Sequence, residues 1–105
     1  MQNYPVRTTH RARLTLPALL ETCRSTFGTA EVEGEVVVAS FGALHRLATR
    51  PAGKELRVDV TMDPKVAPDV AAETVRRYNV FLEAATGFSA KERARRLRKS
   101  AGSGG

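Results

Sequence analysis

The chain has little of what many functional sites are built from. Its 105 residues include no tryptophan and one cysteine, and aromatic residues make up 6% of the total. A single cysteine excludes an internal disulfide framework and a cysteine-rich metal site. No apolar run approaches the ~20 residues of a membrane span. Residues 1–15 also lack the apolar segment of a secretory signal, so the sequence predicts one small cytoplasmic domain with no membrane contact.

Patterns typical of catalysis or metal binding are also missing. His10 and His45 lie far apart in the sequence and form no metal-ligand spacing, and there is no glycine-rich phosphate-binding loop. Cys23 falls on an apolar helical stripe, which favours a buried thiol over a reactive one. Three glutamates alternate along one predicted strand: Glu31, Glu33 and Glu35. Such alternation is more typical of a solvated sheet face than of a cation site. We expect a non-enzymatic protein with no catalytic residues, metal or cofactor.

Hydrophobic periodicity predicts helices at two places in the chain, with strands before and between them. Residues 15–27 have helical spacing, with Thr15 at the N-cap and Gly28 at the C-terminal stop. A second helix begins near Pro68 and ends at Gly87, with Val75 on its buried face. Strands are predicted at 4–9, on a sheet edge, and at 30–41, 43–49 and 56–62, with a turn at 50–53.

The order of these elements, β-α-β-β-β-α-α, predicts an α+β fold. We expect an antiparallel sheet of about four strands with the helices packed on one face. Residues 1–88 form the single α+β domain. Ser89 and Glu92 have the spacing of a capping box that starts a basic C-terminal helix over 89–99. The Gly/Ser tail, residues 100–105, is expected to be disordered.

The strand predicted over 36–41 is apolar on both sides, which leaves two interpretations. Val36 and Val38 point one way, while Val37, Ala39 and Phe41 point the other. Either this is a central strand that is covered on both faces, or one face is exposed. In the second case Val37, Ala39 and Phe41 would bind a protein partner or a second copy of the chain.

Positive charge is concentrated at the C-terminus. The net charge is +6, and residues 91–99 carry six cations against Glu92, which leaves only +1 for residues 1–90. The six are Lys91, Arg93, Arg95, Arg96, Arg98 and Lys99. Either this is a solvated terminal helix, or it contacts nucleic acid without sequence preference by neutralising phosphates. Three N-terminal arginines would extend the basic surface if the N-terminus lies nearby: Arg7, Arg11 and Arg13.

Several segments resemble a small archaeal family of unknown function. They are Tyr4-Pro-Val-Arg7, Arg76-Arg-Tyr-Asn79, Phe81-Leu-Glu-Ala-Ala-Thr-Gly-Phe88 and the basic run from Ser89 to Lys99. The resemblance implies an archaeal source and a fold similar to one half of the TATA-box-binding protein, a curved antiparallel sheet backed by helices. It supplies no activity, and fold analogy alone does not transfer the DNA contacts of that protein.

Overall fold

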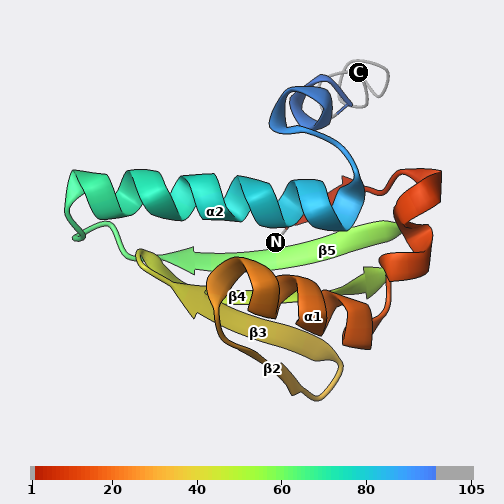
Figure 1. The fold of residues 1–105 in the computed structure, drawn as a ribbon, viewed down its shortest axis with the longest axis horizontal. Helices are drawn as coiled ribbons and strands as arrows, with labels where there is room; N and C mark the ends of the chain where they lie inside the picture. Colours follow the sequence, from red (N-terminus) through yellow and green to blue (C-terminus); the bar gives the residue numbers. More distant parts are fainter. Residues whose placement is uncertain (1, 97–105) are drawn as a thin grey trace.

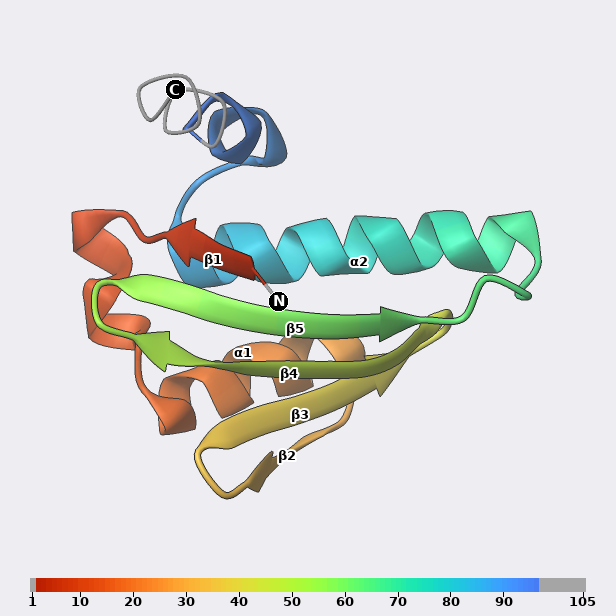
Figure 2. The same ribbon diagram turned by 180° about the vertical axis from the view of Figure 1, so that it is seen from behind.

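The computed structural model describes residues 2–96, and within them five strands form one antiparallel sheet. The strands are β1 Gln2–Pro5, β2 Ala30–Glu33, β3 Val36–Phe41, β4 Leu44–Ala52 and β5 Glu55–Met62. Their order across the sheet is β1-β5-β4-β3-β2. Helices α1 (Leu16–Phe27) and α2 (Pro68–Thr86) lie on one face of this sheet (Figure 1). The opposite face has no helix across it in the described part of the chain (Figure 2). The predicted α+β fold is confirmed, with β1 on an edge as expected.

Both main helices begin and end where the sequence predicts. The Thr15 hydroxyl accepts a hydrogen bond from the Ala18 N–H at 3.3 Å and caps α1, which ends at Gly28. Helix α2 ends at Gly87, whose left-handed φ of 79° closes the last turn. Residues 90–96 form a further helical segment, as expected. The predicted first strand is shorter than expected, because the 3-10 helix η1 (Thr8–Arg13) follows it.

The prediction of one continuous strand over 30–41 is wrong. Glu33 pairs with Val36, so the chain reverses through the two-residue turn Gly34-Glu35 and forms β2 and β3. Two-residue hairpin turns of this kind need a positive φ, and Gly34 has φ 64°. The sheet therefore has five strands where about four were expected.

The turn predicted at 50–53 also lies further along the chain. Strand β4 continues to Ala52, which pairs with Glu55, so the turn consists of Gly53 and Lys54. Pro51 is tolerated because the pairing of β4 with β3 has already ended there, and proline is accepted at such edges. This turn places Lys54 at the same end of the sheet as the C-terminal part of β1.

The core lies between the sheet and the two helices. Its largest fully buried side chains come from α1, α2 and three central strands: Leu19, Phe81, Leu82, Val37, Leu44, Leu47 and Leu56. Val75 was expected in this core but is 51% exposed, and Thr74 occupies the buried position. The Thr74 hydroxyl accepts a hydrogen bond from the Ala43 N–H at 2.9 Å and donates to the Val70 carbonyl at 2.7 Å. The bond from Ala43 holds Thr74 against the turn between β3 and β4, whereas the bond to Val70 lies within α2.

Candidate functional site

The two ends of the described chain meet beside the end of α2. The Arg7 N–H donates to the Thr86 carbonyl at 2.8 Å, just after β1. The Thr86 hydroxyl accepts a hydrogen bond from the Phe88 N–H at 3.2 Å and so fixes the turn that leads into residues 90–96. Gly87 lies against His10, and a side chain at Gly87 would begin 2.6 Å from the His10 Nδ1. The N-terminal segment is therefore packed tightly against the start of the C-terminal helix.

The capping box predicted at Ser89 is confirmed. The Ser89 N–H donates to Glu92 Oε1 at 3.1 Å, and the Glu92 N–H donates to the Ser89 hydroxyl at 3.2 Å. The second carboxylate oxygen of Glu92 accepts a hydrogen bond from the Arg7 guanidinium at 3.0 Å. The hydrogen bond from the Ser89 backbone lowers the pKa of Glu92 below its usual range, with a smaller contribution from Arg7.

Arg93 was predicted to contact nucleic acid, and the structure corrects this prediction. Its side chain is 3% exposed and turns inward. The guanidinium donates to the Phe88 carbonyl at 2.6 Å and to Asn79 Oδ1 at 2.9 Å, which ties the C-terminal helix to α2. Burial lowers the pKa of Arg93, but a guanidinium stays charged in proteins. Arg93 is thus a positioning residue with no free surface to offer a ligand.

Two other arginines stack on Phe88. The guanidinium carbon of Arg7 lies 4.6 Å from the centre of the Phe88 ring, and that of Arg96 lies 4.2 Å from it. The Arg7 Nε also donates to the Gly87 carbonyl at 3.1 Å. Contact of a cation with an aromatic face is attractive and limits the freedom of the arginine side chain. Phe88 therefore holds two positive charges in place at its surface.

Beside this stack lies a hollow of about 460 Å³ that is lined mainly by cationic and hydroxyl-bearing side chains. Its cations come from three segments of the chain: Arg7 and Arg11 near the N-terminus, Lys54 in the β4–β5 turn, and Arg96. Thr8, Thr9 and Glu55 also line it, and Pro5, Val6 and Phe88 supply its apolar part. Within residues 2–96, the ion pairs leave Arg11, Lys54 and Arg96 without a carboxylate partner. We call this hollow the basic cleft.

The cleft accounts for only part of the predicted basic surface. Arg7 and Arg11 do join Arg96, whereas Arg13 lines a separate hollow beside α1. Lys91 and Arg95 are exposed on the C-terminal helix. Arg98, Lys99 and residues 100–105 lie outside the described residues. Sequence reasoning missed Lys54, because only the pairing of Ala52 with Glu55 brings that turn to the end of the sheet where β1 finishes.

The predicted partner-binding patch does not form, because its residues face the helices. Val37 and Ala39 are 0% and 4% exposed and belong to the core. Phe41 is half-buried, with its ring centre 6.1 Å from that of Phe27 and the Arg77 guanidinium 5.6 Å above it. The Val37 face is buried, which rules out the exposed patch, but no helix covers the other face within residues 2–96, so the expected cover on both faces is not found either. The opposite face carries the half-buried Val36 and Val38.

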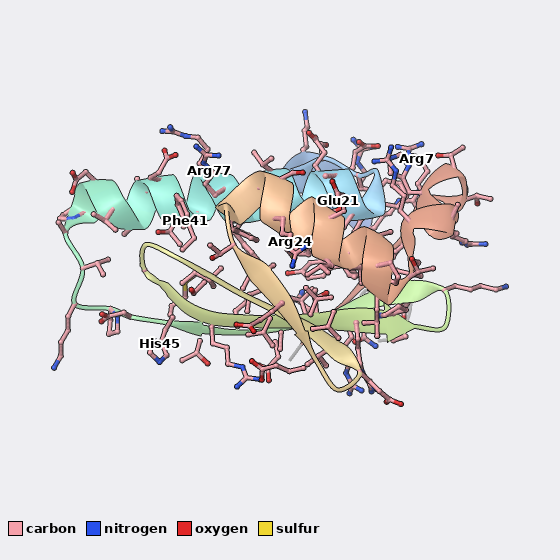
Figure 3. The ribbon with its side chains drawn as sticks, turned by 60° about the horizontal axis from the view of Figure 1, so that its bottom comes forward. Arg7, Glu21, Arg24, Phe41, His45 and Arg77 are labelled. Atoms are coloured by element: carbon pink, nitrogen blue, oxygen red, sulfur yellow. The ribbon has the colours of Figure 1, made fainter. Side chains whose placement is uncertain are left out.

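The remaining chemically active residues are dispersed. Cys23 is buried, as expected, and burial raises the pKa of its thiol to about 12. His10 lies against Gly87, whereas His45 lies on β4, well away from Arg7 at the other end of the molecule (Figure 3). Among residues 2–96, no three histidine, cysteine, aspartate or glutamate side chains gather as metal ligands. Neither main helix has the length and apolarity that crossing a membrane would require.

These features define a small α+β protein with a basic cleft where its two ends meet. A family model described as a domain of unknown function (DUF5611) matches residues 1–99, and the chain belongs to this family. The fold is similar to the NMR solution structure of the hypothetical protein TA0095 from Thermoplasma acidophilum. The TM-score is 0.69 at 26% identity, over 92% of this chain and 97% of that one. No curated protein matches the chain.

Proposed function

We propose that this chain is a small, non-enzymatic, cytoplasmic binding module that contacts the phosphate backbone of nucleic acid. One observation carries the proposal: four cations from three separate segments converge on the basic cleft. Lys91 and Arg95 extend this charge along the exposed side of the C-terminal helix. Arginine and lysine bind phosphates and release counterions, a mode of contact that does not depend on base sequence.

The arrangement of charge argues against a purely structural role for the cleft. Like charges that are held together raise the free energy of the folded state unless something anionic compensates them. The helix macrodipole favours a cation in the last turn of a helix, but it does not act on Lys54, which lies in the turn between β4 and β5. Three of the four cleft cations have no carboxylate partner among residues 2–96. A polyanionic ligand would supply the missing compensation.

The structure offers a matched pair of lysines for the test. Lys54 lines the cleft before β5, and Lys65 is an exposed residue that follows β5 at the opposite end of the sheet. Eight residues of strand separate the two ends by about 27 Å, more than a Debye length at physiological salt. Lys54→Glu and Lys65→Glu change the net charge equally, so only their positions differ.

We expect Lys54→Glu to weaken binding of a fluorescent oligonucleotide about tenfold at about 50 mM salt. The plot of log K against log salt concentration has a negative slope, and its magnitude should decrease by about 1 or somewhat more. Lys65→Glu should leave both quantities close to those of the wild type. Absence of binding by the wild type at this salt concentration, or equal losses in the two variants, would refute the proposal.

The similarity of this fold to one half of the TATA-box-binding protein is also part of the proposal. An antiparallel sheet with two helices on one face supports it. That protein reads the minor groove with its sheet and wedging phenylalanines. The contact proposed here lies instead at the end of the sheet, in the basic cleft, so its test does not depend on the fold similarity.

A further inference from the structure

The charge of the basic cleft can be compared with the charges of possible phosphate ligands. Four cations line it, and two carboxylates accompany them: Glu55 in the lining and Glu92, which is paired with Arg7. The net charge at the cleft is therefore +2. An internal phosphodiester carries a single negative charge, whereas a phosphomonoester carries about −1.5 to −2 near neutral pH. A terminal phosphate balances this cleft, and an internal one leaves it positive.

The donors of the cleft suit a phosphate with three free oxygens. The guanidinium groups of Arg7 and Arg96 are planar and can donate two parallel hydrogen bonds to a phosphate. Stacking on Phe88 restricts the conformations of both side chains before any ligand binds. A preorganised side chain loses less conformational entropy when it binds. Lys54 adds a compact ammonium group, and the Thr8 hydroxyl lies in the same lining. These groups approach the cleft from different segments, so they can contact different oxygens of one phosphate.

The volume of the cleft limits the size of the group that enters it. About 460 Å³ lies at the lower end of the range for small-ligand pockets, which is roughly 300–1,000 Å³. A phosphate with its sugar is of a size that this space can hold. Val6 and Phe88 are almost fully buried, so the apolar surface left for the carbon atoms of the sugar comes mainly from the half-buried Pro5.

We infer that the basic cleft is a site for a terminal phosphomonoester, such as the phosphorylated end of a nucleic-acid strand. The choice of a nucleic-acid strand as the larger ligand rests on the proposed function. Binding of the phosphomonoester group in the cleft does not depend on that function. The same group occurs at the end of a strand and in a free nucleotide or sugar phosphate. Lys91 and Arg95, exposed on the adjoining helix, favour the strand, because they would contact phosphates beyond the terminal one.

Oligonucleotides of one sequence with different ends provide the test. We expect the full-length protein to bind a 5′-phosphorylated or 3′-phosphorylated single strand about tenfold more tightly than the strand with two hydroxyl ends, at matched salt. Arg11→Ala and Lys54→Ala should each reduce this preference at least threefold. Lys65→Ala is the matched control and should leave the preference unchanged. Arg11 and Lys54 are exposed and form no ion pair within residues 2–96, so circular dichroism should show intact folding in both variants.

The outcomes separate this inference from the proposed function. Salt-sensitive binding with equal affinity for phosphorylated and hydroxyl ends would overturn the terminal-phosphate site and leave the nucleic-acid function standing. Binding of a mononucleotide 5′-phosphate that is lost in Lys54→Ala, with no binding of any strand, would support the site and overturn the nucleic-acid function. A preference that survives in both Arg11→Ala and Lys54→Ala would overturn the assignment of the site to this cleft.

Discussion

Within residues 2–96, arginine covers phenylalanine in two clusters, and they differ in how the charge is compensated. At one end Arg77 lies over Phe41, and its Nε is paired with Glu73 at 3.1 Å. Arg77 also donates to the Thr26 carbonyl at 3.3 Å. Figure 3 shows Phe41 and Arg77 together, far from Arg7. The other Glu73 oxygen pairs with Arg76 at 2.7 Å, so both cations of this cluster have a carboxylate partner, although they share it. Arg77 closes the edge of the aromatic core beside Phe41.

The cluster around Phe88 has the same residue types but a different balance. Two arginines stack on one ring, and only Arg7 is paired, with Glu92. Arg11 and Lys54 then bring further positive charge to the adjoining cleft. An arginine on an aromatic ring is therefore not evidence of a binding site by itself. What distinguishes the Phe88 end from the Phe41 end is the presence of cations with no carboxylate partner within residues 2–96: Arg11, Lys54 and Arg96.

The largest effect should come from removing the buried arginine that supports the Phe88 end. Arg93→Ala leaves the Phe88 carbonyl and Asn79 without their donor in a buried place, so we expect the free energy of unfolding to fall by about 2–4 kcal/mol. Urea denaturation followed by circular dichroism measures the change. Arg95→Ala, on the exposed side of the same helix, should stay within about 0.5 kcal/mol of the wild type. A small effect of Arg93→Ala would mean that its bonds do not hold the helix in place.

A smaller change in stability should distinguish the Phe41 cluster from the Phe88 cluster. Arg77→Ala removes a cation that is paired with Glu73 and lies over Phe41, and we expect it to destabilise the protein by about 1 kcal/mol. Arg11→Ala removes a cation that has no carboxylate partner within residues 2–96, so at low salt it should leave stability unchanged or raise it by a few tenths of a kcal/mol. Thermal unfolding at two salt concentrations measures both. Salt should shrink any gain from Arg11→Ala, because it screens the repulsion that the variant relieves. Equal destabilisation by the two variants would contradict the comparison.

Local patterns in the sequence predicted those parts of the fold that local bonds determine. The cap at Thr15, the ends at Gly28 and Gly87, and the box of Ser89 and Glu92 depend on residues within a turn or so of one another, and all are confirmed. The hairpin at Gly34 was missed, because alternating residues continue on both sides of the turn and resemble one longer strand.

The site depends on tertiary contacts that no local pattern contains. Arg93 appears as one of six similar cations in the sequence, and only the position of Asn79 on α2 turns it inward. Val37 and Val38 are equally apolar neighbours, and the side on which α1 packs decides that Val37 is the fully buried one. The basic C-terminal segment was recognised, but its convergence with Lys54 follows from the register of β4 with β5.

The smallest expected effect is the pH dependence of stability that comes from Glu92 and its bonds to Ser89 and Arg7. The pKa of Glu92 is lowered in the folded protein, so its carboxylate contributes stability above the unfolded pKa of about 4.3, and this contribution is lost as pH falls below that value. Glu92→Gln should therefore be less stable than the wild type near neutral pH, and the two should converge near pH 3. Denaturant titrations at several pH values measure this difference.

Arg7→Leu shows which partner of Glu92 matters more. The largest cause of the lowered pKa is the Ser89 N–H, which the variant leaves in place, so Arg7→Leu should keep most of the pH dependence that Glu92→Gln removes. Equal loss in the two variants would show that the ion pair dominates. If the cap dominates, Glu92 stays bound to Ser89 even when a phosphate competes with it for Arg7. The start of the C-terminal helix then stays intact when a ligand fills the cleft, because the Ser89–Glu92 capping box does not depend on Arg7.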